Sequence, residues 1–152
     1  VKGMALGVQY HLLFEKEGFA ALVLSMKLQQ KRESQVFYMS PITKFTQGYD
    51  LLLGARAPDK SVLFATIYKG GKPLERAIVK APQSEKVVYE RISDLGSSPD
   101  ETLFSSMSNG KVTLWNIDPG KVSLDVFYDG VHLGRRLVRV IPGMTHQIKI
   151  DF

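Results

Sequence analysis

Residues 117–130 have the sequence IDPGKVSLDVFYDG, and residues 131–143, VHLGRRLVRVIPG, follow directly. Apolar side chains occupy alternate positions in the first stretch, at Val122, Leu124, Val126 and Tyr128. Alternation with a period of two is typical of a β-strand that buries one face. The pairs Pro119-Gly120 and Asp129-Gly130 are turn sequences, and Asp-Gly favours the tight turn of a β-hairpin. The stretch therefore predicts a turn, a half-buried strand and a hairpin.

The same pattern of short apolar runs between turn residues extends along the chain, which contains 13 Gly and 7 Pro in 152 residues. The runs predict strands at residues 8–15, 20–29, 35–41, 49–56, 61–69, 75–81, 86–91, 111–117, 121–129, 135–141 and 146–152. Short strands at regular spacing are typical of a sandwich or barrel, so we predict an antiparallel all-β fold. The run at 20–29 also contains helix formers, and a short helix is the alternative there.

Residues 93–110, SDLGSSPDETLFSSMSNG, interrupt this pattern. Clusters of Ser, Asp, Gly, Asn and Pro are typical of loops, and this one is either a long surface loop or a linker. We predict one β-sandwich domain over residues 1–152. The alternative is a first β unit at 1–92, a linker at 93–110 and a second β unit at 111–152.

An internal similarity links residues 62–82, VLFATIYKGGKPLERAIVKAP, with residues 122–142, VSLDVFYDGVHLGRRLVRVIP. The two segments align without a gap, and each consists of an apolar run, a turn with Gly, a second run and a Pro. An ancestral duplication is one explanation. The other, which we favour, is that two β-hairpins are alike because Gly suits the turn and Pro ends strand pairing. Both explanations predict two meandering β units.

Residues 111–152 resemble the end of a transthyretin-like or carboxypeptidase-regulatory-like β-sandwich, and also PEGA-type surface repeats. The resemblance is carried by Pro119-Gly120, by the run into Tyr128-Asp129-Gly130, and by the closing Pro142-Gly143. It implies an immunoglobulin-like or transthyretin-like sandwich that acts as a non-catalytic accessory domain, often in extracytoplasmic bacterial proteins. The family has no fixed catalytic residues, so none is transferred to this sequence.

The net charge is +5, which favours contact with polyanions, acidic partners or anionic membrane surfaces but also simply aids solubility. The chain has no Cys, which excludes disulfides, thiolate metal sites and thiol catalysis. Its longest apolar stretch, 19–28, is about half the roughly 20 residues that a membrane helix needs, so we expect no membrane span. The first residue is Val1, as expected of a chain that lost a signal peptide and equally of a shortened chain. We predict a periplasmic or secreted protein.

No residue pattern predicts catalysis or metal binding. The three histidines, His11, His132 and His146, lack the close spacing of metal ligands, although pairing of the last strands would bring His132 near His146. The Ser-rich loop has no nearby His, and no phosphate-binding or dinucleotide motif is present. Trp115 lies in an apolar run, which favours a place in the core over a ligand-binding surface. We predict no catalytic residue, no metal and no cofactor.

Four basic residues on the last two predicted strands are the candidate binding site: Arg135, Arg136, Arg139 and Lys149. Such a face binds polyanions by charge, but Lys and Arg on strand edges also prevent aggregation. The leading hypothesis is a non-enzymatic binding or assembly module that contacts another protein through loops or an exposed strand edge. The alternatives are binding of a polyanion, either polysaccharide or nucleic acid, and a small hydrolase with an unidentified site. The oligomeric state stays open.

Overall fold

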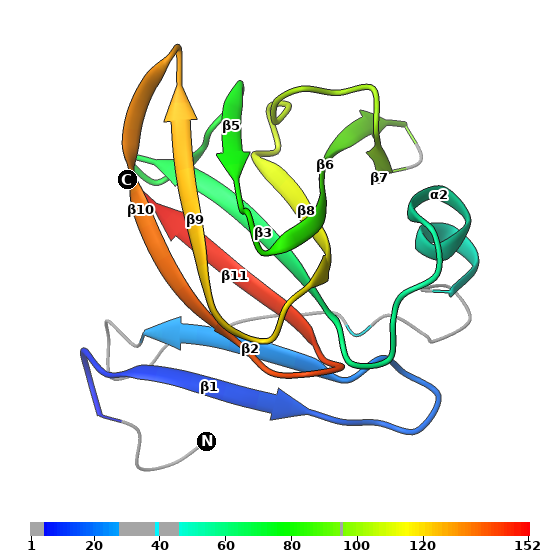
Figure 1. Cartoon of the computed structure of the whole chain (residues 1–152). Helices are drawn as coiled ribbons and strands as arrows, with labels where there is room; N and C mark the ends of the chain where they lie inside the picture. Colours follow the sequence, from blue (N-terminus) through cyan, green and yellow to red (C-terminus); the bar gives the residue numbers. More distant parts are fainter. Residues whose placement is uncertain (1–4, 28–38, 40–45, 95) are drawn as a thin grey trace.

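The computed structural model describes residues 5–27, 39, 46–94 and 96–152. Two helical turns and a series of strands follow one another in this part of the chain (Figure 1). They are β1 (Gln9–Phe14), β2 (Leu22–Lys27), the π-helical turn η1 (Thr46–Asp50), α2 (Leu51–Leu53), β3 (Ser61–Lys69), β4 (Lys72–Pro73), β5 (Ala77–Lys80), β6 (Ser84–Ser93), β7 (Gly96–Asp100), β8 (Lys111–Ile117), β9 (Gly120–Tyr128), β10 (Val131–Val140) and β11 (Thr145–Asp151). The expected all-β character is confirmed, including a strand within the ambiguous run at 20–29.

The strands form a large and a small sheet. The large sheet has the order β1-β2-β11-β3-β8-β6-β7, with β4 attached to β3, and the small sheet has the order β10-β9-β5. The expectation of purely antiparallel pairing is wrong for the large sheet, because β11 runs parallel to both of its neighbours, β2 and β3. β11 follows a strand of the other sheet, so its direction is set by a crossing between sheets and not by a hairpin.

The main core lies between the two sheets. Val122, Leu124 and Val126 of β9 are fully buried there, as their alternation predicted, whereas Tyr128 is only partly buried. The large sheet contributes buried side chains from β3, β8 and β11, among them Leu63, Leu114 and Ile148. Strands on both sides of residues 93–110 thus contribute to one hydrophobic cluster.

The outer face of the large sheet is covered in part by η1 and α2, where the sequence predicted a strand at 49–56 (Figure 1). The run of leucines suggested a buried strand, but only Leu53 is buried, while Leu51 and Leu52 are exposed. Tyr49 and Leu53, one helical turn apart, pack on the sheet with Trp115. The expectation that Trp115 belongs to a core is confirmed, since its side chain is fully buried.

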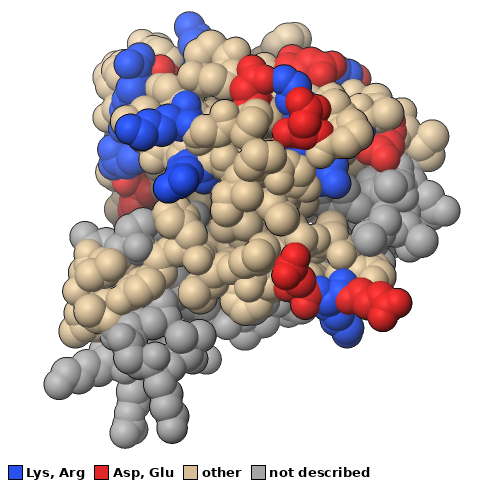
Figure 2. Space-filling model, turned by 60° about the horizontal axis from the view of Figure 1, so that its bottom comes forward, with Lys and Arg blue, Asp and Glu red and all other residues tan. Residues whose placement is uncertain are grey.

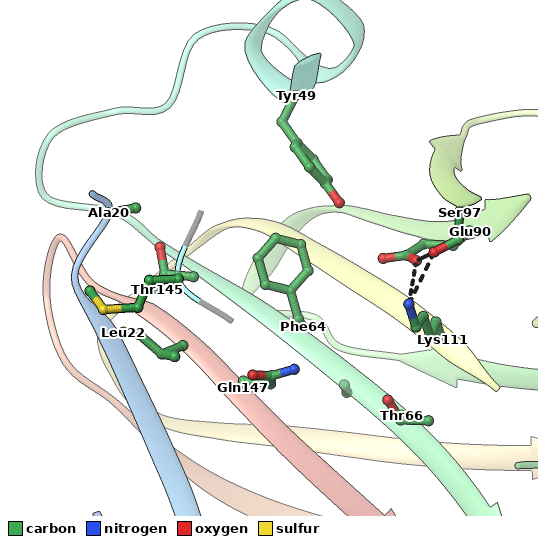
Figure 3. Close-up of a pocket in the computed structure, with 12 residues that line it drawn as sticks. Ala20, Leu22, Tyr49, Phe64, Thr66, Glu90, Ser97, Lys111, Thr145 and Gln147 are labelled. Atoms are coloured by element: carbon green, nitrogen blue, oxygen red, sulfur yellow. Dashed lines mark hydrogen bonds and ion pairs between the residues drawn. The ribbon is translucent and has the colours of Figure 1, made fainter. Parts of the chain in front are cut away.

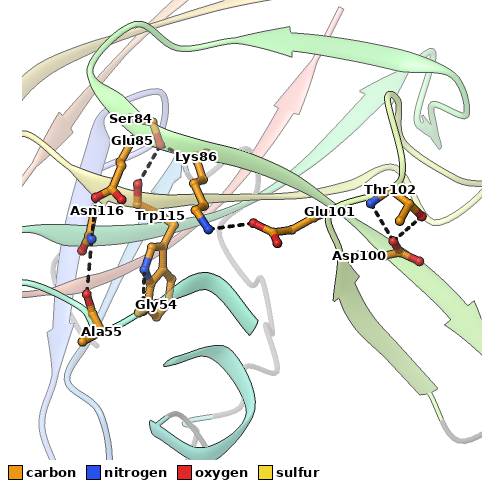
Figure 4. A network of polar contacts seen from close by, with 10 residues as sticks. All are labelled: Gly54, Ala55, Ser84, Glu85, Lys86, Asp100, Glu101, Thr102, Trp115 and Asn116. Carbon is orange, nitrogen blue, oxygen red and sulfur yellow. Dashed lines mark hydrogen bonds and ion pairs between the residues drawn. The ribbon is translucent and has the colours of Figure 1, made fainter. Parts of the chain in front are cut away.

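A bulge in β8 fixes the chain that follows this helical segment. Asn116 has a positive φ of 50°, and the pairing of β3 with β8 shifts register at this point. The Asn116 side chain donates to the Glu85 carboxylate at 2.7 Å (Figure 4). It also accepts from the Ala57 N–H at 3.1 Å. The Trp115 indole N–H donates to the Gly54 carbonyl at 3.2 Å. These bonds tie residues 54–57 to the outer face.

The segment 93–110, expected to be a loop or linker, contains a further strand. β7 pairs with β6, from Tyr89↔Asp100 to Ser93↔Gly96. Asp100 accepts hydrogen bonds from the backbone and side chain of Thr102, and Lys86 forms an ion pair with Glu101 (Figure 4). The Thr102 bonds, followed by the contact with Arg91, lower the pKa of Asp100 to about 2. The predicted strand 35–41 lies outside the described residues except for Met39.

The two similar segments are not two equivalent hairpins. Residues 122–142 form the hairpin β9–β10 within the small sheet. Residues 62–82 begin in the large sheet with β3 and β4 and then cross to the small sheet, where β5 pairs with β9. The expectation of two meandering β units is therefore wrong.

Candidate functional site

A cleft opens along the side of the molecule where β2 and β11 separate. The two strands pair only from Thr145↔Leu22 to Gln147↔Leu24, and Figure 1 shows them diverging beyond this point. Among the described strands β10 pairs with β9 alone, and several of its residues line the cleft. The cleft has a volume of about 430 Å³, with an apolar floor that includes Val138, Ile148 and Ile150.

Basic side chains dominate the rim of this cleft. Of the four predicted residues, Arg136, Arg139 and Lys149 line it, and Lys121 and His11 join them. Asp151 is the single acidic residue among the lining residues that the structure describes. Figure 2 shows Lys and Arg gathered on the side of the molecule that carries β10 and β11. We call Lys121, Arg136, Arg139 and Lys149 the basic rim.

Arg136 is held in place by neutral groups. Its guanidinium lies 4.4 Å from the centre of the Phe152 ring and donates to the carbonyls of Arg135 and Asp151 at 3.2 and 3.0 Å. None of these contacts cancels its charge, and a guanidinium has five N–H donors, so several remain for a ligand. Gly134 allows this packing, because a Cβ there would lie 3.1 Å from the Phe152 ring.

Two other members of the basic rim face each other directly. Lys121 lies opposite Arg139 in the register of β9 and β10. Like charges directly opposite one another destabilise an antiparallel pair. Within the described residues, neither of these two side chains nor Lys149 forms an ion pair. These three positive charges therefore have no acidic partner among the described residues.

Arg135 differs from the other three predicted residues. It lies opposite Asp125 on β9 and donates to both carboxylate oxygens at 2.9 Å. His132 contacts the same carboxylate at 3.0 Å. The hydrogen bond from Arg135 holds the pKa of Asp125 below its usual value, and the pKa of Arg135 is raised in turn. Arg135 is thus neutralised by its neighbour and is absent from the cleft lining.

The histidines are not brought together as pairing of the last strands suggested. His132 lies near the start of β10, whereas His146 accepts the Ile141 N–H just beyond its end, at 3.0 Å. Ten residues of extended chain separate these ends by about 30 Å. No group of three or more potential metal-binding side chains occurs among the residues that the structure describes. His146 is fully buried, and burial lowers its pKa.

Sequence reasoning missed Lys121 and His11 as members of the cleft. The Asp129-Gly130 turn predicts the register of β9 and β10, and with it a position for Lys121 close to Arg139. No comparable signal existed for His11, because β1 reaches the cleft only through the parallel pairing of β2 with β11.

No helix in the described part of the chain is long and apolar enough to cross a lipid bilayer.

No family model matches the chain, and no curated protein is significantly similar to it.

Proposed function

We propose that this protein is a non-catalytic binding module that holds an anionic polysaccharide along the basic rim. The observation that carries the proposal is the direct juxtaposition of Lys121 and Arg139 on β9 and β10 with no carboxylate partner among the described residues. An arrangement that costs stability in the free protein becomes favourable when an anionic group lies between the two charges. Arg136, already held by neutral contacts, adds oriented donors at little entropic cost.

The composition of the cleft favours a polysaccharide over a nucleic acid. Proteins that bind single-stranded nucleic acids stack the bases on aromatic side chains. Among the described residues, the cleft lining contains no Phe, Tyr or Trp, and its apolar floor consists of aliphatic residues. A sulfated or carboxylated sugar polymer needs repeated cations and no stacking surface. We therefore take nucleic acid as an outcome of the test and not as the proposed ligand.

A protein partner added as a strand along β10 is the second candidate, since β10 pairs only with β9. The Phe152 ring packs against Gly134, and the Arg136 side chain folds over the Asp151 carbonyl. Both groups lie at the free side of β10 and obstruct the first half of that edge. An added strand needs a continuous row of free backbone groups, so this candidate is less favoured.

The remaining proposals concern family and location. A transthyretin-like or carboxypeptidase-regulatory-like sandwich is supported by the two packed sheets and by the β9–β10 hairpin. The parallel strand β11 is a departure that this proposal has to accommodate. A periplasmic or secreted location fits a binding module for a sugar polymer and rests on the sequence resemblance alone.

Binding to heparin as a function of salt tests the proposal. We expect the affinity to fall steeply with salt, since binding by charge releases counterions from the polymer. The double variant Arg139→Gln/Lys149→Gln is expected to lower affinity about ten-fold and to reduce the salt slope by about one unit for each lost cation. The matched control is Lys72→Gln/Lys80→Gln, which removes the same charge from exposed positions outside the cleft.

Three results would contradict the proposal. Equal weakening by both double variants would show that net charge alone attracts heparin. A short single-stranded DNA that binds as tightly as heparin, with the same dependence on Arg139 and Lys149, would assign the site to nucleic acid. Preferential binding of a polyglutamate peptide would instead favour the protein partner.

A further inference from the structure

A second cavity lies on the opposite, outer face of the large sheet, away from the basic rim. Its volume is about 220 Å³, smaller than the sites that hold drug-sized ligands. Strands β2, β11 and β3 form its floor, and β6, β7 and β8 supply one wall, with η1 above (Figure 3). None of the residues of the basic rim lines it.

The wall formed by β6, β7 and β8 is polar but electrically balanced. Glu90 is buried, with 6% of its surface exposed. Its carboxylate accepts from the Ser97 hydroxyl at 2.6 Å and lies 3.5 Å from the Lys111 ammonium, which also donates to Ser97 at 3.0 Å. The second carboxylate oxygen of Glu90 points toward Phe64 and the cavity (Figure 3). This wall therefore offers donors and acceptors without a net charge.

The opposite side of the cavity carries hydroxyl and amide groups. Thr145 on β11 is buried, and its hydroxyl has no hydrogen-bond partner. Gln147, two residues further on the same face, is exposed and directs its amide along the floor toward Thr66 (Figure 3). A buried hydroxyl without a partner costs free energy unless a ligand or a water molecule bonds to it.

An aromatic surface separates these two polar sides. The Phe64 ring rises from the floor, and the Tyr49 ring meets it edge-on with centroids 5.4 Å apart. Tyr49 also stacks on the buried Trp115 at 5.9 Å, which fixes its ring. Burial first, and then the negative charge of Glu90, raise the pKa of Tyr49. The phenol accordingly stays protonated at neutral pH.

We propose that this cavity binds a single neutral sugar ring, with the Phe64 face against the ring and with Glu90 and Gln147 bonding to its hydroxyl groups. A pyranose has this combination of an apolar face and hydroxyl groups around its edge. A cation is disfavoured because Lys111 already balances Glu90, and an anion is disfavoured because Glu90 balances Lys111. A purely apolar ligand would leave the Thr145 hydroxyl without a partner.

The test uses the full chain and amide correlation spectra by NMR. Methyl β-glucoside, methyl β-galactoside and N-acetylglucosamine are added to about 50 mM, a range that covers millimolar affinities. We expect at least one of them to shift the amide signals of Phe64, Thr66 and Gln147. Gln147→Ala is expected to weaken binding about five-fold, the effect of losing one hydrogen bond, and Glu90→Gln to weaken it at least as much.

The controls separate this site from the fold and from the basic rim. Glu75→Gln changes the same functional group at an exposed position outside the cavity, and Arg139→Ala removes a member of the basic rim; both should leave sugar binding unchanged. Gln147 is exposed, so its variant keeps the fold even where Glu90→Gln does not. Absence of any shift at the cavity with all three sugars would overturn the proposal. It would equally be overturned if ethylammonium or acetate shifted these signals more than the sugars.

Discussion

Residues 62–82 and 122–142 are alike in sequence, and each has a first strand, a tight turn, a second apolar run and an exit turn, yet the second runs pair differently. Gly70-Gly71 and Asp129-Gly130 all have positive φ, as two-residue hairpin turns require. After the second strand, the Ser84 N–H bonds to the Ala81 carbonyl and the Met144 N–H to the Ile141 carbonyl. Between these turns, β10 stays beside β9, while the other segment leaves β3 after two paired residues.

The difference follows from the neighbours of each first strand. β8 occupies the edge of β3 from Ser61 to Thr66, so only the end of β3 is available to β4. Pro73 lacks a backbone N–H and cannot extend the ladder. β9 has one edge free for its whole length, and β10 fills it. Similar local sequences thus predict the turns, while competition for a strand edge decides the pairing.

The crossing from β4 to β5 is held by groups that have no equivalent in the β9–β10 hairpin. Ser106, which is buried, accepts the Ala77 N–H at 2.9 Å and donates to the Leu74 carbonyl at 2.7 Å through its hydroxyl. The Tyr89 hydroxyl reaches from β6 across the core to accept the Val79 N–H at 2.9 Å. Gly110 accepts the Ile67 N–H beside the crossing.

The largest expected effect comes from Gly110→Ala. Its Cβ would lie 2.5 Å from the Ile67 carbonyl oxygen, at a φ of +66°. We expect the free energy of unfolding to fall by about 3 kcal/mol or more, since backbone has to move. The matched control is Gly130→Ala in the hairpin turn, where φ is +78° and no atom lies within 4 Å. It should cost about 1 kcal/mol, the penalty of the backbone conformation alone. Urea denaturation measures both, and equal losses would contradict the distinction.

Ser106→Ala should have the next largest effect. It leaves the Ala77 N–H and the Leu74 carbonyl buried without their partner, which is expected to lower the free energy of unfolding by about 2 kcal/mol. Ser108→Ala, at an exposed position two residues away, is the control and should change stability by less than about 0.5 kcal/mol. If the two variants have the same stability, the hydrogen bonds of the Ser106 hydroxyl do not stabilise the crossing from β4 to β5.

The smallest expected effect is a pH dependence of the free energy of unfolding, which comes from His146 at the exit of the β9–β10 hairpin. Burial lowers the pKa of His146, followed by the charge of His11, and the neutral ring accepts the Ile141 N–H. The unfolded chain then binds the proton more readily than the folded one. The neutral His146 ring contributes its full stabilisation at pH values above about 6.5, which is the pKa of histidine in the unfolded chain. This contribution is lost as the pH falls from that value toward the lower pKa that His146 has in the folded protein.

Urea denaturation across this pH range checks the prediction. The free energy of unfolding should be flat from about pH 8 to 7 and decline from about pH 6.5 to 5. His146→Gln removes the titrating group and should flatten the decline. A decline of the same size in that variant would contradict the assignment to His146.

Much of the fold followed from the sequence, because period-two alternation and turn chemistry are local signals. Most predicted runs coincide with a strand to within a few residues. The exceptions are 49–56, which is helical, and 35–41, which lies outside the described residues except for Met39. The helical turn at Tyr49–Leu53 escaped prediction because three leucines in a row fit a buried strand as well as a helix. The parallel place of β11 depends on contacts between distant residues, which no local pattern records.

The candidate sites were predictable to different degrees. Three of the four predicted cations line the cleft, since strand alternation and the hairpin register order side chains on neighbouring strands. Arg135 was predicted to be part of the binding site because the sequence did not reveal its ion pair with Asp125. The outer cavity was not predicted at all. Phe64, Glu90 and Gln147 belong to three different strands and are far apart in the chain.

The position of β11 imposes an order on folding. In the described part of the chain, the hairpin β1–β2 pairs with the rest of the large sheet through three residues of β11, Thr145, His146 and Gln147. Because β1 and β2 precede residues 145–147 in the chain, they are synthesised earlier and wait for those residues before they join the rest of the sheet. Contacts between such distant segments slow folding because a long loop has to close first. During synthesis β1 and β2 have two unpaired edges, and they depend on late closure by β11 to avoid pairing with other chains.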